Sequence, residues 1–469
     1  MVFSSMTFVP LFLPLVCFLY YAFRNIKARN AVLLVFSLAF YAWGEPKWIF
    51  VMLLTVTVNY FCGLMIDRFE SQMKRTLCMV TGVALSLGFL FYFKYFGFFT
   101  EVITGLAGIE NTFSAPVLPI GISFYTFQVL TYTVDVYRKK VPVQKSYTKL
   151  LLYVSFFPQL IAGPIVNYTD IAKSLDDRTT TAENVYHGIM RFFIGFAKKV
   201  LLANTCGIIT DELMAAGQLS VAGGWLMAIA YALQIYFDFS GYSDMAIGMG
   251  RIFGFHFFEN FNYPYISQSV TEFWRRWHIS LGTFFRDYVY IPLGGNRVGK
   301  WKNIRNIMIV WLLTGFWHGA SWNFLAWGIY YGLLLLAEKF WLKDLKKHLP
   351  KTVNLLSTLI FVLIGWVLFY YEDLAQGLNH LKIMFGFAGA ELCDPVVVYY
   401  FKYYLVFIAA AILASVPWKK AMECTAVAQS TVVQKICGYL KPLVVTVLFL
   451  LSMAMIVTQS YNPFLYFRF

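Results

Sequence analysis

Charged residues are scarce in this chain. Only 13% of its 469 residues are charged and 59% are hydrophobic, whereas a soluble domain carries about 25% charged residues. A water-soluble globule could not bury so much apolar surface. The alternating segments of about ten residues that are typical of membrane strands are also lacking, because the apolar runs are long and unbroken. The sequence therefore predicts an all-α polytopic membrane protein.

Two kinds of site are also missing. The seven cysteines are scattered, with no CxxC pair and no metal spacing, so they are predicted to be buried free thiols. His278 and His318 have no carboxylate motif beside them, and no metal site is predicted. The net charge of the chain is +14. No basic stretch of the sequence also has a soluble fold around it, which argues against nucleic-acid binding. The positive charge indicates basic rims that face anionic lipid or an anionic cytosolic donor.

The chain is predicted to be one membrane domain over residues 1–469, with about ten to twelve membrane-spanning helices and no internal repeat. The first apolar run has no basic segment before it and no cleavage site after it, so it is interpreted as a span, not a signal peptide. Lys and Arg in alternate loops place the N-terminus outside. The predicted spans are Thr7–Phe23, Ala31–Trp43, Trp48–Ile66, Leu77–Phe99, Pro116–Val136, Leu150–Val166, His187–Ile209, Gly223–Phe239, Ile307–Ala337, Val353–Tyr370, Tyr399–Val416 and Pro442–Thr458.

Two stretches do not look like plain spans. Ser155–Pro164 is apolar but is interrupted by Pro158, Gly163 and Pro164. Irregular backbone at membrane depth is tolerated only where protein buries it or where it lines a cavity. Gly250–Arg305 carries too many arginines and lysines to cross a bilayer and is rich in aromatic residues. It is interpreted as interfacial and re-entrant helices on the cytoplasmic side.

His318 is the leading candidate for a functional residue. It is the only side chain that can take a positive charge in Ile307–Ala337, a run that is longer than the roughly 20 residues of a membrane helix and holds one long or two broken segments. An imidazole at that depth is costly unless it faces a polar cavity or a partner. The alternative is a neutral histidine that bonds a neighbouring helix. Gly315 and Gly319 allow a close approach of another chain segment, and the neighbouring tryptophans, Trp317 and Trp322, supply apolar walls.

His278 is the second candidate. Ser269 and Glu272 have the spacing of a capping box, which predicts that a helix begins there. On one continuous helix Trp274, His278, Leu281 and Phe285 would share a face. His278 would then face an aromatic surface, either as a packed core residue or as a residue that lines the path of a donor and assists His318.

Three further features are ambiguous. Gly294–Lys300 resembles the start of a phosphate-binding loop but is followed by Trp301, so a glycine turn is favoured. Asp238 and Asp244 are expected to pair with nearby arginines rather than to relay protons. The last residues, Pro463–Phe469, read PFLYFRF. They form either an interfacial anchor or a tail that presents the hydroxyl of Tyr466.

At these residues the sequence resembles the membrane-bound O-acyltransferase superfamily. The resemblance lies in MVFSSMTFVPLFLPLV, PQLIAGPIV, FDFSGYSDMAIGMGRIFGF, NFNYPYIS, FWRRWHISLGTFFRDYVYIPLGGNR and TGFWHGASWNFLAWG. It is densest from Asp238 to Trp327, within a characteristic core of residues 150–340, and falls to hydropathy alone in the C-terminal third. The most similar branch contains the alginate O-acetyltransferase membrane subunit and bacterial peptidoglycan O-acetyltransferases.

This resemblance implies a ring of helices around a transmembrane tunnel in the bacterial cytoplasmic (inner) membrane. It implies that His318 is the principal catalytic histidine, that His278 is the second, and that Tyr466, in the tail of residues 459–469, carries the acyl group transiently. It also implies an extracytoplasmic partner of the SGNH type and a polysaccharide acceptor. No tightly bound cofactor is implied, because acetyl-CoA or an acyl carrier thioester is the donor substrate.

The mechanism expected on this basis begins at the cytoplasmic rim, where Arg275, Arg276 or Lys300 meets the phosphates of the donor. Neutral His318 then takes the proton of an acceptor hydroxyl, that of Tyr466 being the candidate, as its oxygen attacks the thioester. The product is an O-acetylated extracytoplasmic polysaccharide, alginate-like or another polymer. The alternatives are a component of peptidoglycan O-acetylation, and a transporter or scaffold without chemistry, for which broken helices and buried ionisable residues would also serve.

Overall fold

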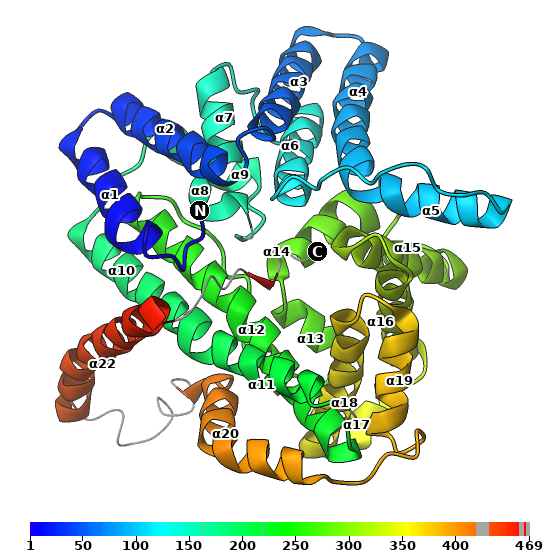
Figure 1. Cartoon of the computed structure of the whole chain (residues 1–469). Helices are drawn as coiled ribbons and strands as arrows, with labels where there is room; N and C mark the ends of the chain where they lie inside the picture. Colours follow the sequence, from blue (N-terminus) through cyan, green and yellow to red (C-terminus); the bar gives the residue numbers. More distant parts are fainter. Residues whose placement is uncertain (162, 218, 419–430, 459–463, 466–469) are drawn as a thin grey trace. The chain divides into compact units, whose positions relative to one another are not determined.

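The computed structural model describes residues 1–161, 163–217, 219–418, 431–458 and 464–465, and Figure 1 gives the order of their helices. Every regular element among these residues is a helix. The predicted all-α class is therefore confirmed. The chain forms two compact units, residues 1–192 with 242–258 and residues 193–241 with 259–469.

The first unit holds the N-terminal helices. Helix α6 and the part of α7 from Leu150 onward are almost completely buried, although α6 carries hydroxyl and amide side chains along much of its length. The elements are η1 (Phe8–Phe12), α1 (Leu13–Ala22), α2 (Ile26–Gly44), α3 (Ile49–Arg68), α4 (Gln72–Leu90), η2 (Phe91–Tyr95), α5 (Phe96–Ala107), α6 (Ile122–Tyr137), α7 (Tyr147–Ser155), α8 (Phe157–Leu160) and α9 (Tyr168–Asp176).

The second unit carries both candidate histidines. Two helices, α10 (Ala182–Ala197) and α12 (Val221–Ile252), contribute residues to both units. The others are η3 (Lys198–Ala203), α11 (Asn204–Ala215), η4 (Pro264–Ile266), α13 (Val270–Arg276), α14 (Ile279–Phe285), η5 (Arg286–Tyr290), α15 (Lys300–His318), α16 (Trp322–Phe340), α17 (Lys343–His348), α18 (Lys351–Tyr370), α19 (Leu374–Met384), α20 (Pro395–Ala414) and α22 (Thr431–Thr458).

Seven helical runs among the described residues are long and apolar enough to cross a membrane. They coincide with seven of the twelve predicted spans, which are those in α2, α3, α4–α5, α10–α11, α18, α20 and α22. The chain is therefore a multi-pass membrane protein. The other five predicted spans are shorter helices, broken segments or part of the long helix α12.

The interrupted stretch Ser155–Pro164 is one of the broken segments. Helix α7 ends at Ser155, the backbone of Phe156 is extended, and the single turn of α8 follows with Pro158 in its first positions. Phe156 and Phe157 are buried, so the irregular backbone lies inside protein as predicted.

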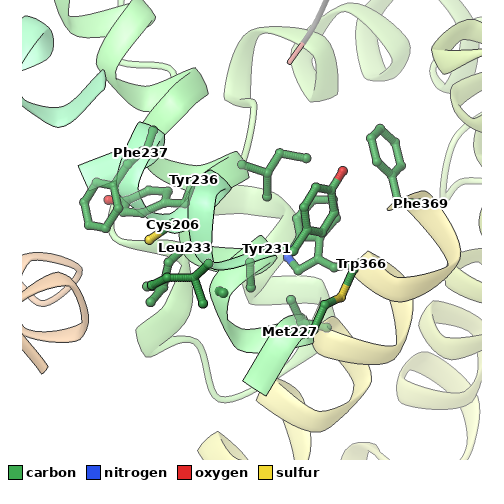
Figure 2. Packing of buried hydrophobic residues seen from close by; sticks show 14 of the residues in the cluster. Cys206, Met227, Tyr231, Leu233, Tyr236, Phe237, Trp366 and Phe369 are labelled. Carbon is green, nitrogen blue, oxygen red and sulfur yellow. The ribbon is translucent and has the colours of Figure 1, made fainter. Parts of the chain in front are cut away.

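The core of the second unit is built around α12 and α18. Figure 2 shows Tyr231, Tyr236 and Phe237 of α12 in the same cluster as Trp366 and Phe369 of α18. All five residues are at most 3% exposed. Burial of such large aromatic groups gives the cluster a well-defined packing, and the histidines described below lie at its edge.

Candidate active site

His318 is the last residue of α15, at the tip of a helical hairpin. The run Ile307–Ala337 is two helices, since the chain is extended at Gly319 and Ser321 caps α16 by accepting a hydrogen bond from the backbone of Phe324. Of the two predicted alternatives, one long segment or two broken segments, the second is therefore correct. A Gly-Ala-Ser triplet ends one helix and starts the next because serine is a strong N-cap residue.

Close contact between the two helices depends on glycine. A Cβ atom on Gly315 of α15 would lie 2.3 Å from the carbonyl oxygen of Phe324. A Cβ atom on Gly328 of α16 would lie 2.5 Å from the carbonyl oxygen of Trp311. The prediction that small residues beside His318 admit a neighbouring segment is confirmed for Gly315, and the neighbour is α16 itself.

The imidazole of His318 lies in a box of aromatic rings. It is 6% exposed, and its ring centroid is 5.2 Å from that of Trp327 and 5.0 Å from that of Phe369, both in edge-on geometry. Phe324 stacks at 6.3 Å. Trp322, the second predicted wall of this slot, is 60% exposed, and its part as a wall stays a prediction.

His278 lies between two short helices rather than within one. Helix α13 ends at Arg276, Trp277 is extended, and His278 has a left-handed backbone with φ 44° before α14 begins. The prediction of one continuous helix is therefore wrong. Its predicted start is correct, because the Ser269 side chain accepts from the backbone of Glu272.

A neighbouring segment explains the break at His278. The backbone N–H of Ile279 donates to the carbonyl of Asn260, and the N–H of Asn262 donates to the carbonyl of Arg276. These bonds pair residues 260–262 with residues 276–279 and replace the hydrogen bonds that a continuing helix would have made.

The tautomer of His278 follows from the bonds of Asn260. Asn260 Oδ1 accepts from the backbone N–H of Ser280 at 3.1 Å and from its hydroxyl at 2.9 Å, so this atom is the amide oxygen. His278 Nδ1 lies 3.2 Å from the same oxygen and must donate to it. The lone pair is therefore on Nε2, which is buried and has no hydrogen-bond partner among the described residues.

His278 lines a small cavity of about 180 Å³. Trp274, Trp277, Leu281 and Phe285 supply apolar walls. Besides His278, the polar residues of the lining are Thr314, Arg286 and Tyr290. Burial lowers the pKa of His278 to about 3. The site thus presents one neutral imidazole with a free acceptor nitrogen in an apolar setting.

Aromatic rings connect the two histidines. The ring of Trp317 is 6.0 Å from that of His278 and 4.9 Å from that of His318. On the other side of His278, Phe239 of α12 makes an edge contact at 4.6 Å. The two imidazoles therefore belong to one aromatic cluster, and their catalytic roles stay a prediction.

The predicted donor-binding residues are less clearly assembled. Arg275 and Lys300 are exposed, and Lys300 lies over the ring of Phe340 at 5.4 Å. Arg276 is paired with Glu272 at 2.8 Å. Their part in donor binding stays a prediction, as does that of Tyr466, which lies outside the described residues.

The structure also shows the setting of the glycine stretch and of the two aspartates. Gly294 and Gly295 both have positive φ and form a turn before α15, so the glycine turn is confirmed. Asp244 pairs with Arg191 at 2.6 Å. Among the described residues, Asp238 pairs with a lysine, Lys199, instead of the predicted arginine.

Sequence reasoning missed two residues that hold the site in place. Asn260 orients His278, and a motif quoted for the resemblance, NFNYPYIS, contains it. Glu338 is 8% exposed and accepts hydrogen bonds from the backbone N–H groups of Val270 and Thr271, the first two residues of α13. The signal for Glu338 was a carboxylate directly after the apolar run Ile307–Ala337.

Comparison with known proteins shows the family of this chain. The model of the membrane-bound O-acyltransferase family matches residues 138–378, which include both histidines and Asn260. The chain belongs to this family. It is thus an O-acyltransferase with a helical, multi-pass architecture.

Several curated proteins are similar to this O-acyltransferase. The Probable alginate O-acetylase AlgI of Pseudomonas putida is 37% identical over 100% of both chains. The Peptidoglycan O-acetyltransferase of Helicobacter pylori is 34% identical over 84% of this chain and 81% of its own. The Teichoic acid D-alanyltransferase of Bacillus subtilis is 32% identical over 52% of this chain and 65% of its own.

Proposed function

We propose that this O-acyltransferase takes an acetyl group from a cytoplasmic thioester and delivers it for O-acetylation of an extracytoplasmic polysaccharide, in the bacterial inner membrane. The similarity to an alginate O-acetylase over the whole chain supports acetyl as the group and a polysaccharide as the acceptor. The observation that carries the proposal is the buried pair of imidazoles in one aromatic cluster, one of which keeps a free acceptor nitrogen.

The two histidines have different tasks in this proposal. A general base works best when its pKa lies near the working pH, and His278, with a pKa of about 3, is a poor proton acceptor. His318 is the general base that takes the proton from the acceptor hydroxyl as its oxygen attacks the thioester carbon. The thiolate leaves and is protonated, and the acetyl group becomes an ester.

His278 has a positioning task for the donor. Its Nε2 can accept a hydrogen bond from an amide N–H, and the pantetheine arm of coenzyme A or of a carrier protein offers two such groups. The apolar walls around the cavity suit the methylene groups of that arm. Arg275 and Lys300 at the exposed side are the candidates for contact with donor phosphates.

The acceptor in this proposal is the hydroxyl of Tyr466, from which an extracytoplasmic SGNH-type partner passes the acetyl group to the polymer. A phenol near pKa 10 needs a base to attack at neutral pH, and general-base help is worth about 10²–10⁴ in rate. Loss of His318 is therefore expected to remove activity without removing the fold.

The test is made in a strain that lacks the gene. Wild type and His318→Ala are supplied at equal membrane abundance, and ester-linked acetate is measured in the purified extracellular polysaccharide and in peptidoglycan. Acetate restored to the polysaccharide by wild type alone supports the proposal. Acetate restored only to peptidoglycan would favour the second candidate, which the Helicobacter pylori relative suggests. Full restoration of ester-linked acetate by His318→Ala would refute both candidate functions and would favour a scaffold without chemistry.

A further inference from the structure

The second unit contains a buried ion pair that none of the steps above uses. Lys199 of η3 and Asp238 of α12 are each 2% exposed, and Lys199 Nζ lies 2.5 Å from Asp238 Oδ1. The cost of removing two charges from water can exceed their mutual attraction, so a buried pair is weak evidence of stabilisation alone. The pair calls for a different explanation.

Both members of the pair contact the C-terminal end of the chain. The second carboxylate oxygen of Asp238 accepts a hydrogen bond from the backbone N–H of Leu465 at 2.9 Å. The ammonium group of Lys199 lies 4.9 Å from the ring centroid of Phe464, in cation–π geometry. Phe464 is 1% exposed, and Leu465 packs against the aromatic core of the unit. Residues 464 and 465, the short dark-red piece in Figure 1, are therefore packed into the protein.

The local backbone is shaped to bring the pair together. Lys199 lies in a π-helical segment, a wider turn that is often found at functional sites. A Cβ atom on Gly241 of α12 would lie 2.7 Å from the carbonyl oxygen of Gly195 and 3.1 Å from the backbone nitrogen of Lys199. Glycine at position 241 thus permits η3 to approach α12 closely enough for the pair to form.

The same turn of α12 reaches the histidine cluster. Asp238 holds the chain end, and the next residue, Phe239, makes the edge contact with the ring of His278. A displacement of α12 at this point would disturb both contacts. The chain end and the histidine cluster therefore share one support.

We propose that Lys199 and Asp238 form a docking socket for the C-terminal segment, which positions Tyr466 for acylation. The inference rests on the proposed function, in which Tyr466 is the acceptor. Tyr466 directly follows Leu465, so the anchor lies one residue before the reacting hydroxyl. Lys199 and Asp238 are positioning residues, because they contact the tail rather than the reacting atoms.

The test measures the acetyl ester on Tyr466 in the full-length protein. Purified protein is incubated with acetyl-CoA, and the C-terminal peptide is analysed by mass spectrometry over time. Asp238→Asn keeps the shape of the side chain but removes the negative charge of this hydrogen-bond acceptor. This variant is expected to lower the initial rate of acetyl-ester formation on Tyr466 at least tenfold, since hydrogen bonds to charged groups are stronger than those between neutral groups. The KM for acetyl-CoA is expected to stay unchanged, because the residues proposed to contact the donor, His278, Arg275 and Lys300, are not part of the socket.

A matched pair at Leu465 isolates the backbone hydrogen bond. Leu465→Pro removes the N–H that Asp238 accepts, whereas Leu465→Ala removes side-chain packing and keeps this N–H. The proline variant is expected to be labelled at least tenfold more slowly than the alanine variant. Both changes lie at the end of the chain, so this comparison still decides the matter if Asp238→Asn unfolds.

Hydrogen exchange gives a readout that does not depend on catalysis. The amide of Leu465 is expected to exchange slowly in wild type and at least tenfold faster in Asp238→Asn. Wild-type labelling of Asp238→Asn and Leu465→Pro, together with wild-type exchange of the Leu465 amide in Asp238→Asn, would overturn the socket and leave the proposed function intact. Protein that is active on polysaccharide but never labelled on Tyr466 would overturn the carrier and the socket together.

Discussion

Replacement of Gly315 by alanine is predicted to disturb the hairpin that carries His318. The added Cβ atom would lie 2.3 Å from the carbonyl oxygen of Phe324 and 3.2 Å from Cα of Gly328. Ordinary contact begins about 1 Å further out, and both obstacles are backbone atoms of α16, so the two helices must separate. Overpacking of this kind costs about 1–3 kcal/mol, and a displacement of about 1 Å at a catalytic group can cost about 10²-fold in rate.

The matched control is Gly88→Ala in α4. A Cβ atom there would meet nothing within 4 Å, so only the higher helix propensity of alanine acts, which is worth up to about 1 kcal/mol in favour of folding. The assays are thermal unfolding of the purified protein in detergent and the rate of acetyl transfer. Gly315→Ala should unfold at a lower temperature and lose most activity, whereas Gly88→Ala should lose neither. A Gly315→Ala protein as stable and active as Gly88→Ala would refute the account of the hairpin.

Two further predictions concern the supports of the site. His278→Ala should raise the KM for the donor roughly tenfold, the worth of one neutral hydrogen bond, and the pH–rate profile should keep its wild-type shape because a group with a pKa of about 3 does not titrate near neutrality. Loss of an acidic limb in the variant would show that His278 titrates after all. Glu338→Gln should lower stability at pH 7 by about 1–3 kcal/mol, since charge-assisted bonds to α13 are lost. Burial alone would raise the pKa of Glu338, but hydrogen bonds from Lys346, Thr271 and Val270 lower it overall, so its contribution is present above the unfolded pKa of about 4.3 and disappears as pH falls through the folded pKa. A wild-type protein and a Glu338→Gln variant that differ equally at pH 7 and at pH 3 would contradict this assignment.

Hydropathy and composition predicted the membrane class and helical architecture correctly, because a long apolar run leaves a membrane chain few alternatives. The two candidate histidines were also found from the sequence, His318 because it lies in a long apolar run and His278 because it lies among aromatic residues. The break at His278 was not predictable, because it depends on bonds from the distant Asn260. The sequence alone does not decide whether the helix ends after His318, since glycine and serine at positions 319 and 321 occur both within helices and at helix ends.

The residues that support the site could not be identified from the sequence alone, for a physical reason. A single sequence does not show which buried groups meet. Glu338 follows an apolar run and could have been an interfacial residue, yet it accepts from the start of α13. Asp238 was expected to pair, but its second contact is with the backbone of Leu465. A backbone N–H carries no signature in sequence.

The central claim is that His318 catalyses transfer of an acyl group from a thioester to this protein. The most direct measurement is transfer of label from [¹⁴C]acetyl-CoA, or from an acetylated carrier protein, to purified wild type, His318→Ala and Tyr466→Phe, each shown to be folded by its unfolding temperature. The account predicts label on wild type and on neither variant. Label on folded His318→Ala at the wild-type rate would contradict it.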